Sequence, residues 1–374
     1  MKVLVVDDSA LMRRLIKTAL QADGFEVLTA RDGEDALAQL CIHEPDCITL
    51  DINMPKMDGL ECLSRIMTQR PTPVVMVSSL TAKGAMSTLE ALAMGATDFI
   101  CKPGGTVSLN MNEILPKLCA KVRAAVGSKQ RDRSSTMKRA EGQTSRQADA
   151  KAGHVSHRRA SARPGKASIA SGCEVVLVGV STGGPRVIEL LLKDLPTDFQ
   201  LPVVICQHMP SSFTSVFTNR LNGLCQFPVV EVTSQRQLEP STVFIGRGDA
   251  DIVFTKRGTR TFVSSAPSDA RYNWHPSVDR MVYSALDVFD PHKIIGVQLT
   301  GMGDDGAAAF AELQQRGGET IAESSETATI FGMPKALIEL DGANHILRDT
   351  EIAGFLASAV QGRGTPRRTA ASHA

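Results

Sequence analysis

The sequence of 374 residues is poor in aromatic side chains and close to electrically neutral. Phe, Trp and Tyr make up 4% of it, and the formal net charge is +1 at pH 7. A chain this close to neutrality is not drawn as a whole to nucleic acid or to acidic membranes. Its eight cysteines form no C-x-x-C pair, which argues against a zinc site and a thioredoxin-like motif. Scattered single cysteines are typical of a reducing cytosol rather than of a disulfide framework.

Long hydrophobic runs are also missing. The first apolar run, Val3–Val6, ends at Asp7 and is too short for the core of a signal peptide. No uncharged apolar stretch is long enough to cross a bilayer. We therefore expect a cytoplasmic protein without membrane insertion. The hydrophobic content of 43% is sufficient for substantial cores, and the length allows two or three domains.

Short apolar runs alternate with helical patterns in two segments, residues 1–125 and residues 173–360. The runs of the first segment are Val3–Val6, Cys47–Leu50, Val74–Val77 and Asp98–Ile100. Those of the second are 175–178, 203–206, 243–245, 252–254 and 294–299. Between the first two runs, apolar residues follow the spacing of an amphipathic helix at Met12, Leu15, Ile16, Ala19 and Leu20. This alternation predicts two α/β domains, each with a doubly wound parallel sheet covered on both faces.

Two further segments have no pattern of a folded core. From residue 127 to residue 172 the chain lacks Phe, Trp and Tyr, and it has eleven Lys or Arg against three Asp or Glu. Because such a segment buries too little apolar surface to offset its ordering entropy, we predict a flexible basic linker at residues 126–172. A nucleic-acid-binding patch is the alternative, but no aromatic residue is present for base stacking. Residues 361–374 are expected to form a disordered tail.

Polar side chains follow the four apolar runs of the first segment. They are Asp7 and Asp8, then Asp51, Ser78 and Lys102. A doubly wound sheet gathers its ligands beyond the carboxyl ends of its strands, so these side chains can converge on one rim. Three carboxylates repel one another unless a cation joins them, and hard oxygen ligands suit Mg²⁺. Asp51 would then attack a phosphorus atom and become an aspartyl phosphate, with Lys102 and Ser78 contacting its oxygens.

The same residues carry a family resemblance. They stand in Val6-Asp7-Asp8-Ser9, Asp51-Ile52-Asn53-Met54-Pro55-Lys56-Met57-Asp58-Gly59-Leu60, Val77-Ser78-Ser79 and Lys102-Pro103. This set closely resembles the response-regulator receiver family, whose fold is flavodoxin-like, over residues 1–125. The resemblance implies Asp51 as the phosphoacceptor. The implied Mg²⁺ ligands are Asp7, Asp8, Asp51 and the carbonyl of Asn53, and the implied switch residues are Ser78, Phe99 and Lys102. The alternative is a receiver-like fold that is not phosphorylated, but every chemical position is filled.

Ser181 is the candidate nucleophile of the second segment. It lies in a Gly-flanked turn between an apolar run and a helical pattern, where a serine hydroxyl stands clear of a sheet. His208 follows the next run, and Asp304 and Asp305 follow the run at 294–299. A serine, a base and an acid on one rim are the set needed for nucleophilic catalysis. The alternatives are a serine that caps the helix and a structural histidine.

The order of these residues along the chain is Ser, His, Asp. It differs from the Ser, Asp, His order of the α/β hydrolases, which favours a convergent site over membership of that fold. Backbone N–H groups near Thr182 and in the Gly-rich turn Thr300–Gly306 would hold the oxyanion.

The second segment carries a resemblance of its own. Its motifs are Gly179-Val180-Ser181-Thr182-Gly183-Gly184-Pro185, Gln207-His208-Met209-Pro210, Pro276-Ser277-Val278-Asp279, Leu299–Gly306 and Phe331-Gly332-Met333-Pro334-Lys335-Ala336. They resemble the catalytic domain of the chemotaxis protein-glutamate methylesterases, the CheB family, in which a receiver, a tether and an esterase follow in this order. The resemblance implies a Ser181–His208–Asp305 triad, with Asp304 in a variable position. It also associates Met302 with the oxyanion hole.

Two segments depart from the family's pattern. Before Pro276 the family usually has His-Arg, where this chain has Trp274-His275. After the run at 243–245 the family usually has Ala-Pro and a following His, where this chain has Arg247-Gly248-Asp249. Neither segment touches the predicted triad, and both are expected to alter substrate contacts.

The resemblance implies a hydrolase activated by phosphorylation. It would remove methyl groups from glutamate γ-methyl esters on chemoreceptors with release of methanol, and it would also deamidate specific receptor glutamines. The implied partners are methyl-accepting chemoreceptors and a chemotaxis histidine kinase, and the esterase reaction would need no cofactor. One alternative is a non-catalytic response regulator whose second domain only binds a signalling partner. A DNA-binding output is less favoured because no basic recognition helix is visible, so no nucleic-acid partner is expected.

Overall fold

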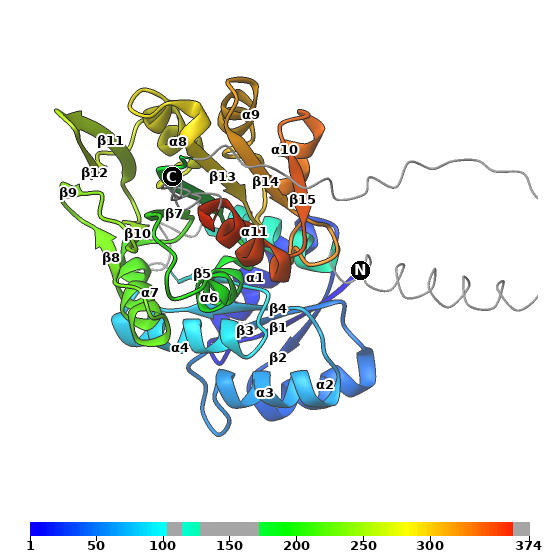
Figure 1. Ribbon diagram of the computed structural model, residues 1–374. Coiled ribbons are helices and arrows are strands. Elements are labelled where there is room, and N and C mark those ends of the chain that lie inside the picture. Colours follow the sequence, from blue (N-terminus) through cyan, green and yellow to red (C-terminus); the bar gives the residue numbers. More distant parts are fainter. Residues whose placement is uncertain (103–113, 128–171, 362–374) are drawn as a thin grey trace, which may run out of the picture. The chain divides into compact units, whose positions relative to one another are not determined.

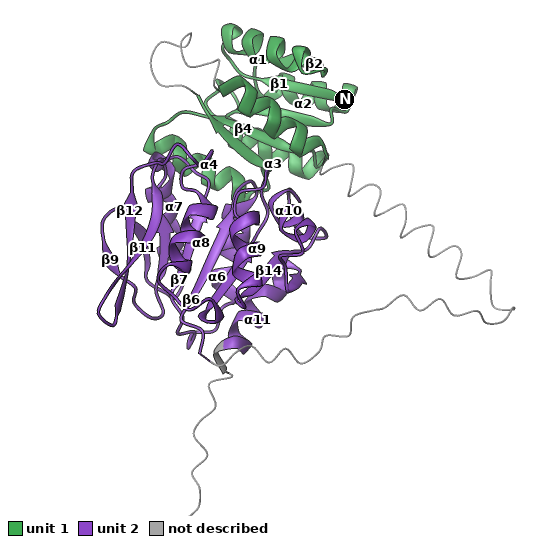
Figure 2. Ribbon diagram, turned by 90° about the horizontal axis from the view of Figure 1, so that it is seen from above, with its two compact units in different colours: residues 1–165 green, residues 166–374 purple. Residues whose placement is uncertain are grey.

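The computed structural model describes residues 1–102, 114–127 and 172–361 (Figure 1). The chain divides into two compact units, residues 1–165 and 166–374 (Figure 2). The predicted linker at 126–172 and the predicted tail at 361–374 lie almost entirely outside the described residues. The predicted domain boundaries therefore stay predictions.

The first unit is built on a five-stranded parallel sheet in the order β2-β1-β3-β4-β5. The strands are β1 (Lys2–Val6), β2 (Glu26–Ala30), β3 (Cys47–Asp51), β4 (Val74–Ser78) and β5 (Asp98–Cys101). The order reverses between β1 and β3. Ligand sites of doubly wound sheets lie at such a switch point, beyond the carboxyl ends of the strands.

Helices cover both faces of this sheet. They are α1 (Ala10–Ala22), α2 (Gly33–His43), α3 (Gly59–Gln69), α4 (Ala82–Ala93) and a helix at residues 114–127. Helix α2 contacts α3, and α3 contacts α4, whereas α1 shares a buried cluster with the helix at 114–127. In α1 the buried side chains are Met12, Ile16 and Leu20, which belong to the stripe that the sequence predicts. Ser9 caps α1 by accepting a hydrogen bond from a backbone N–H of its first turn.

The second unit contains a seven-stranded parallel sheet in the order β15-β14-β13-β6-β7-β10-β8. The strands are β6 (Val175–Val180), β7 (Val203–Gln207), β8 (Val229–Val232), β10 (Val243–Gly246), β13 (Ile294–Gln298), β14 (Glu319–Glu323) and β15 (His345–Leu347). Here the switch point lies between β6 and β13. The three strands that precede Ser181, His208 and Asp305 are therefore neighbours in the sheet, in the order β13-β6-β7.

The helices of the second unit form two groups. They are α6 (Gly184–Asp194), α7 (Ser211–Leu224), α8 (Val278–Leu286), α9 (Ala307–Gln315), α10 (Met333–Glu339) and α11 (Asp349–Gln361), with a 3₁₀ turn at Pro291–Lys293. Helix α6 contacts α7 and α11, whereas α9 contacts α8 and α10 (Figure 1). A separate antiparallel sheet, β11-β12-β9, is formed by β9 (Arg236–Gln237), β11 (Asp251–Arg257) and β12 (Arg260–Ala266).

The predicted fold class is confirmed for both units. The apolar run at 252–254 differs in detail, because it lies in β11 of the antiparallel sheet and not in the parallel one. Among the described residues, no helix combines the length and the apolar character that a membrane crossing requires.

Candidate active site

Ser181 lies immediately after β6, where the chain turns into α6. Its backbone N–H donates to the carbonyl of Thr300 at 3.0 Å, and its carbonyl accepts from Nε2 of Gln207 at 3.0 Å. Thr300 follows β13 and Gln207 ends β7, so both neighbouring strands fix the serine. A Cβ atom at Gly301 would lie 2.9 Å from the Cβ of Ser181, closer than such atoms approach, and only glycine fits there. The turn is therefore specified by its surroundings as well as by its own sequence.

His208 lies after β7 and is paired with Asp305. Its Nε2 is 2.8 Å from Oδ2 of Asp305, and its backbone N–H donates to the carbonyl of Val180, the residue before Ser181. Nδ1 of His208 is buried and has no hydrogen-bond partner among the described residues. Because the carboxylate accepts at Nε2, the proton of the neutral imidazole is assigned to Nε2 and the lone pair to Nδ1. Nδ1 is thus the nitrogen that can accept a proton.

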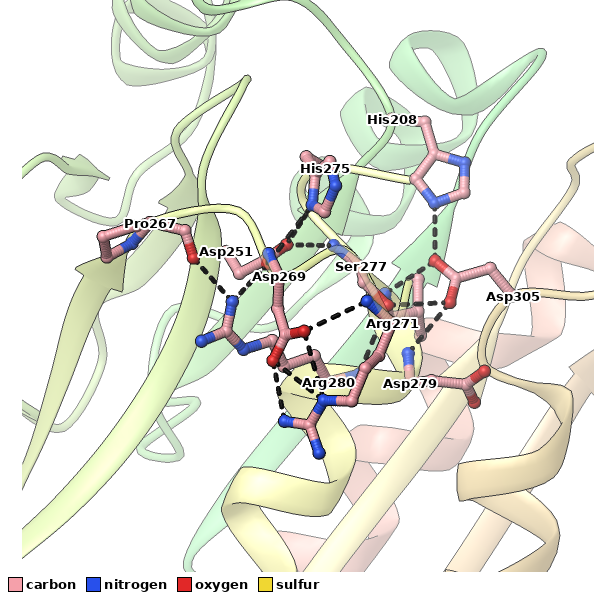
Figure 3. A network of polar contacts seen from close by, with 11 residues as sticks. His208, Asp251, Pro267, Asp269, Arg271, His275, Ser277, Asp279, Arg280 and Asp305 are labelled. Atoms are coloured by element: carbon pink, nitrogen blue, oxygen red, sulfur yellow. Dashed lines mark hydrogen bonds and ion pairs between the residues drawn. The ribbon is translucent and has the colours of Figure 1, made fainter. Parts of the chain in front are cut away.

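Asp305 is held by the N-terminus of α8 (Figure 3). Its Oδ2 also accepts from the N–H of Val278 at 2.7 Å, and its Oδ1 accepts from Oγ of Ser277 at 3.0 Å and from the N–H of Asp279 at 3.1 Å. Burial acts to raise the pKa of Asp305, but the hydrogen bond from His208 and those from the helix outweigh it and hold the pKa below its usual value. The acid is therefore ionised, and it points at the imidazole.

The neighbouring Asp304 is exposed, whereas Asp305 is 1% exposed. Of the two predicted oxyanion residues, Thr182 is buried and its carbonyl accepts from Oγ1 of Thr300 at 2.9 Å. Met302 lies in the turn that leads to Asp305, and no described backbone carbonyl accepts a hydrogen bond from its N–H. That N–H remains available to a ligand.

Thr300 ties the serine turn to a buried carboxylate. Its N–H donates to Oε2 of Glu323 at 2.8 Å, and its Oγ1 accepts from the N–H of Ile330 at 2.9 Å. Glu323 ends β14, is 1% exposed, and also accepts from Oγ1 of Thr327. Burial raises its pKa to about 7, against the opposing effect of these hydrogen bonds. Glu323 was not predicted as part of the site.

Replacing Glu323 by glutamine is expected to flatten the pH dependence of stability. In the folded chain the pKa of Glu323 is about 7, above its ordinary value of 4.5. The contribution of its protonated carboxyl to the free energy of unfolding is therefore complete below pH 4.5 and is lost as the pH rises through 7. The loss amounts to about 3 kcal/mol of unfolding free energy. Glutamine keeps both hydrogen bonds without titrating, because its carbonyl accepts from Thr300 and its amide donates to Thr327. The variant should therefore match the native chain near about pH 5 and exceed its stability near about pH 8.

Urea unfolding followed by the emission of Trp274, the only tryptophan, measures this in the second unit. The exposed Glu326, replaced by glutamine, is the matched control and should keep the native pH profile. Burial also raises the pKa of Asp279, to about 6, but its contribution is common to all three proteins and cancels. An unchanged pH slope in the Glu323 variant would contradict the role assigned to its burial.

A second cluster lies at the switch point of the first unit. Asp7, Asp8 and Asp51 each place a carboxylate oxygen within 4.8 Å of the others. Nζ of Lys102 is 2.7 Å from Oδ2 of Asp51 and 3.0 Å from Oδ2 of Asp7. Burial raises the pKa of Asp51, the ammonium of Lys102 opposes this, and the charge of Asp7 adds to the rise. For Lys102 burial lowers the pKa, but the carboxylates outweigh it and the net direction is upward.

These carboxylates fit a hard divalent cation. Asp7 and Asp51 are buried, Asp8 is exposed, and three negative charges meet one ammonium, so the cluster has an excess of negative charge. Asn53 is exposed two residues after Asp51, and its N–H approaches Oδ1 of Asp51 at 3.4 Å.

The predicted switch residues lie near this cluster but do not all point to it. Ser78 is fully buried at the end of β4, and its Oγ donates to the carbonyl of Gly84 at 3.1 Å in the first turn of α4. Phe99 is 8% exposed in β5, with Nζ of Lys121 at 5.9 Å from its ring centroid. The serine hydroxyl is therefore bonded to α4, while Lys102 is bonded to Asp51.

The segment Arg247-Gly248-Asp249 lies beside the start of α7. Helix α7 begins three residues after His208. Oδ2 of Asp249 accepts from the N–H of Ser211 at 3.1 Å and from its Oγ at 2.6 Å. The residue before α7 is Pro210, which offers no side-chain cap of its own. Asp249 therefore closes this helix from another loop, and we assign the segment a structural role near the site.

Several residues of the site carry only a weak signal in the sequence. Ser277 reads as a helix N-cap, and in the structure it caps α8 as well as donating to Asp305. Gln207, 2% exposed, would have been suspected only as a buried polar residue at a strand end. Thr300 and Glu323 connect through contacts between strands that are distant in sequence.

Comparisons with known proteins agree for both units. The CheB methylesterase family profile matches residues 176–356, and that of the response regulator receiver domain matches residues 3–111. Two solved structures, both from Thermotoga maritima, match the chain in part. The CheB methylesterase catalytic domain is 34% identical, with a TM-score of 0.48, and covers 50% of this chain and 98% of its own. The response regulator domain of CheB is 46% identical, with a TM-score of 0.32, and covers 34% of this chain and 96% of its own.

Relatives of full length are also known. A protein-glutamate methylesterase/protein-glutamine glutaminase of Rhodospirillum rubrum is 52% identical over 358 residues, which is 95% of each chain. One of Vibrio cholerae is 43% identical over 343 residues, or 91% of each chain. At this identity and coverage, with the receiver and esterase profiles in the same order, the chain belongs to the CheB methylesterase family and carries a response-regulator receiver domain.

Proposed function

We propose that this chain is a cytoplasmic hydrolase that demethylates glutamate γ-methyl esters of chemoreceptors and deamidates specific receptor glutamines. Phosphorylation of its receiver domain activates it. The observation that supports this best is the buried His208–Asp305 pair beside Ser181, across the switch point of the second sheet. The names of the full-length relatives supply the substrate class.

In the first step Oγ of Ser181 attacks the ester carbonyl while Nδ1 of His208 takes the serine proton. Asp305 keeps the imidazole in the correct tautomer and stabilises the imidazolium that forms. The N–H groups of Met302 and Thr182 stabilise the oxyanion. Collapse of the tetrahedral intermediate breaks the carbon–oxygen bond to the methoxy group, which leaves as methanol with the proton from His208.

In the second step water attacks the acyl-serine. His208 takes a proton from the water and returns it to Ser181, so that the glutamate carboxyl is formed and the enzyme is restored. A glutamine amide passes through the same tetrahedral intermediate, with ammonia as the leaving group. Both activities therefore follow from one set of residues.

The direct test uses the full chain and membranes that contain chemoreceptors with radiolabelled γ-methyl esters. Labelled methanol should be released in proportion to enzyme, and the rate should rise when Mg²⁺ and a small phosphodonor are added. Absence of methanol under both conditions would contradict the proposed function.

The receiver would accept its phosphoryl group on Asp51 from a chemotaxis histidine kinase. Receiver phosphorylation depends on a divalent metal, and we propose Mg²⁺. Its ligands would be Asp7, Asp8, Asp51 and the carbonyl of Asn53. The bound ion supplies positive charge against the phosphoryl oxygens. Lys102 neutralises one of these oxygens, and Ser78 would leave the carbonyl of Gly84 to donate to another.

Replacing Asp51 by asparagine is expected to abolish activation by a phosphodonor and to leave basal hydrolysis intact. We propose that phosphorylation shifts the population toward an active state, so activation of roughly tenfold or more is expected in the native chain. The rate of methanol release with and without acetyl phosphate measures it. The control is Asp58→Asn, because asparagine also caps α3 well. Activation that survives in the Asp51 variant would overturn this assignment.

The alternative of a non-catalytic regulator is not supported. The full-length relatives are named as enzymes, and Ser181, His208 and Asp305 are all present.

A further inference from the structure

Trp274 is the only tryptophan of the sequence, and it lies against the histidine of the candidate active site. It belongs to the segment between β12 and α8 and is half-buried. Its ring and that of His208 have centroids 5.7 Å apart and planes that differ by 2°. This is an offset-stacked pair, which is a favourable arrangement of two aromatic rings.

The same indole contacts the turn that carries the acid. A Cβ atom at Gly303 would lie 3.1 Å from Cζ2 of Trp274, and Gly303 has a φ of 88° that favours glycine. Gly303 is two residues before Asp305. One side chain therefore packs against both the base and the turn from which the acid reaches the base.

The segment that follows Trp274 is fixed by a buried carboxylate, that of Asp251, whose contacts with His275, Ser277 and Arg280 are drawn in Figure 3. Asp251, the first residue of β11, accepts from Nδ1 of His275 at 3.1 Å and from the N–H of Ser277 at 2.9 Å. Its other oxygen is paired with Arg280 at 2.5 Å. These three partners flank Trp274 on its C-terminal side, so the indole is presented by an anchored segment.

The imidazole of His208 is 10% exposed, and its hydrogen bonds do not fix the ring plane. Nε2 is bonded to Asp305, and Nδ1 has no partner among the described residues. Rotation about the Cβ–Cγ bond would tilt the ring plane and displace Nδ1 while Nε2 stays near Asp305. A flat surface parallel to the ring prevents it. The π face of an indole also attracts the positive charge that the imidazole acquires during the reaction.

We propose that Trp274 is a positioning residue for the hydrolytic reaction, which holds the ring plane of His208 while its Nε2 stays on Asp305. The inference builds on the proposed function and adds a residue to its machinery.

The kinetic test compares Trp274→Leu with Trp274→Phe in the full chain. Leucine fills space without a flat face, so kcat for methanol release should fall roughly tenfold while KM stays within about twofold. Phenylalanine restores a parallel ring and should recover kcat to within about threefold of the native value. An unchanged kcat in the leucine variant, or a change confined to KM, would overturn the proposal. Circular dichroism of both variants checks that they fold.

A second measurement needs no substrate and no loss of stability. A protonated imidazole quenches the emission of an indole stacked on it, so acidification of the native chain should lower its tryptophan fluorescence. The ionisable groups near the stack are His208, Asp305, His275, Asp251, Asp279 and Arg280. The quenching step should disappear in His208→Gln and persist in His275→Gln, whose amide can still donate to Asp251.

Emission that does not change with pH, or a step that survives in His208→Gln, would overturn the stacking role. Because this readout is independent of turnover, it separates the two claims. A chain that releases no methanol but shows the fluorescence step would refute the proposed function and leave the stack in place.

Discussion

Replacement of Ser181 by alanine is expected to lower methanol release by about 10⁶-fold. Oγ of Ser181 is the atom of the proposed triad that bonds to the substrate carbon, and alanine removes it without adding volume. The backbone N–H of Ser181 donates to Thr300 and its carbonyl accepts from Gln207, and neither bond involves the serine side chain, so the turn should persist. Radiolabelled methanol released from receptor membranes, with the receiver phosphorylated, gives the rate.

The matched control for this change is Ser358→Ala. Ser358 is exposed on α11, and its hydroxyl donates to the carbonyl of Phe355 in its own helix. The control should keep the native rate. If the Ser181 variant retained a rate within about tenfold of native, another nucleophile would have to be sought and the covalent mechanism abandoned.

Replacement of Asp305 by asparagine is expected to lower kcat by about 10⁴-fold. All of the acid's hydrogen-bond partners among the described residues are donors, and an amide can present only one accepting oxygen to them. If its NH₂ faces His208, the imidazole must accept at Nε2 and carry its proton on Nδ1. Nδ1 then cannot take the proton of Ser181.

Asp304→Asn is the control for this variant, since Asp304 is adjacent and carries the same charge but is exposed. It should leave kcat within about twofold of native, because a change on the exposed surface leaves the imidazole tautomer alone. Equal losses of kcat in the two variants would mean that the negative charge of the turn matters and that the hydrogen bond between Asp305 and His208 does not. A loss larger at residue 304 would reverse the assignment of the acid.

The strands that position the site could be predicted because they are buried along their whole length. Strands β3, β6, β7 and β13 are continuous apolar runs, and the chemistry follows each of them directly. Strand β14 was not predicted, because only three residues separate the charged Glu319 and Glu323 at its ends and they form too short a run to be recognised. Glu323 is tolerated in the interior only because Thr300 and Thr327 donate to it, and that pairing depends on the fold.

The choice between Asp304 and Asp305 illustrates what spacing alone leaves open. Both follow β13, and only the family resemblance favoured the second. In the structure the difference comes from α8, whose first N–H groups and Ser277 face Asp305 from a segment distant in sequence. The prediction that the Trp274-His275 segment does not touch the triad was wrong, because the ring of Trp274 stacks on His208. That packing depends on how two loops fold.

The position of Asp305 at the first turn of α8 has a consequence for how this protein can change. Removal of a catalytic residue commonly stabilises an enzyme, since active sites keep strained or repelling groups for the sake of activity. Here the acid also satisfies the open N–H groups of a helix that packs on β6, β11 and α9. Its loss would leave buried donors unpaired and would remove the hydrogen-bond partner of His208. A search for more heat-resistant variants should therefore leave this carboxylate in place even when activity is not selected.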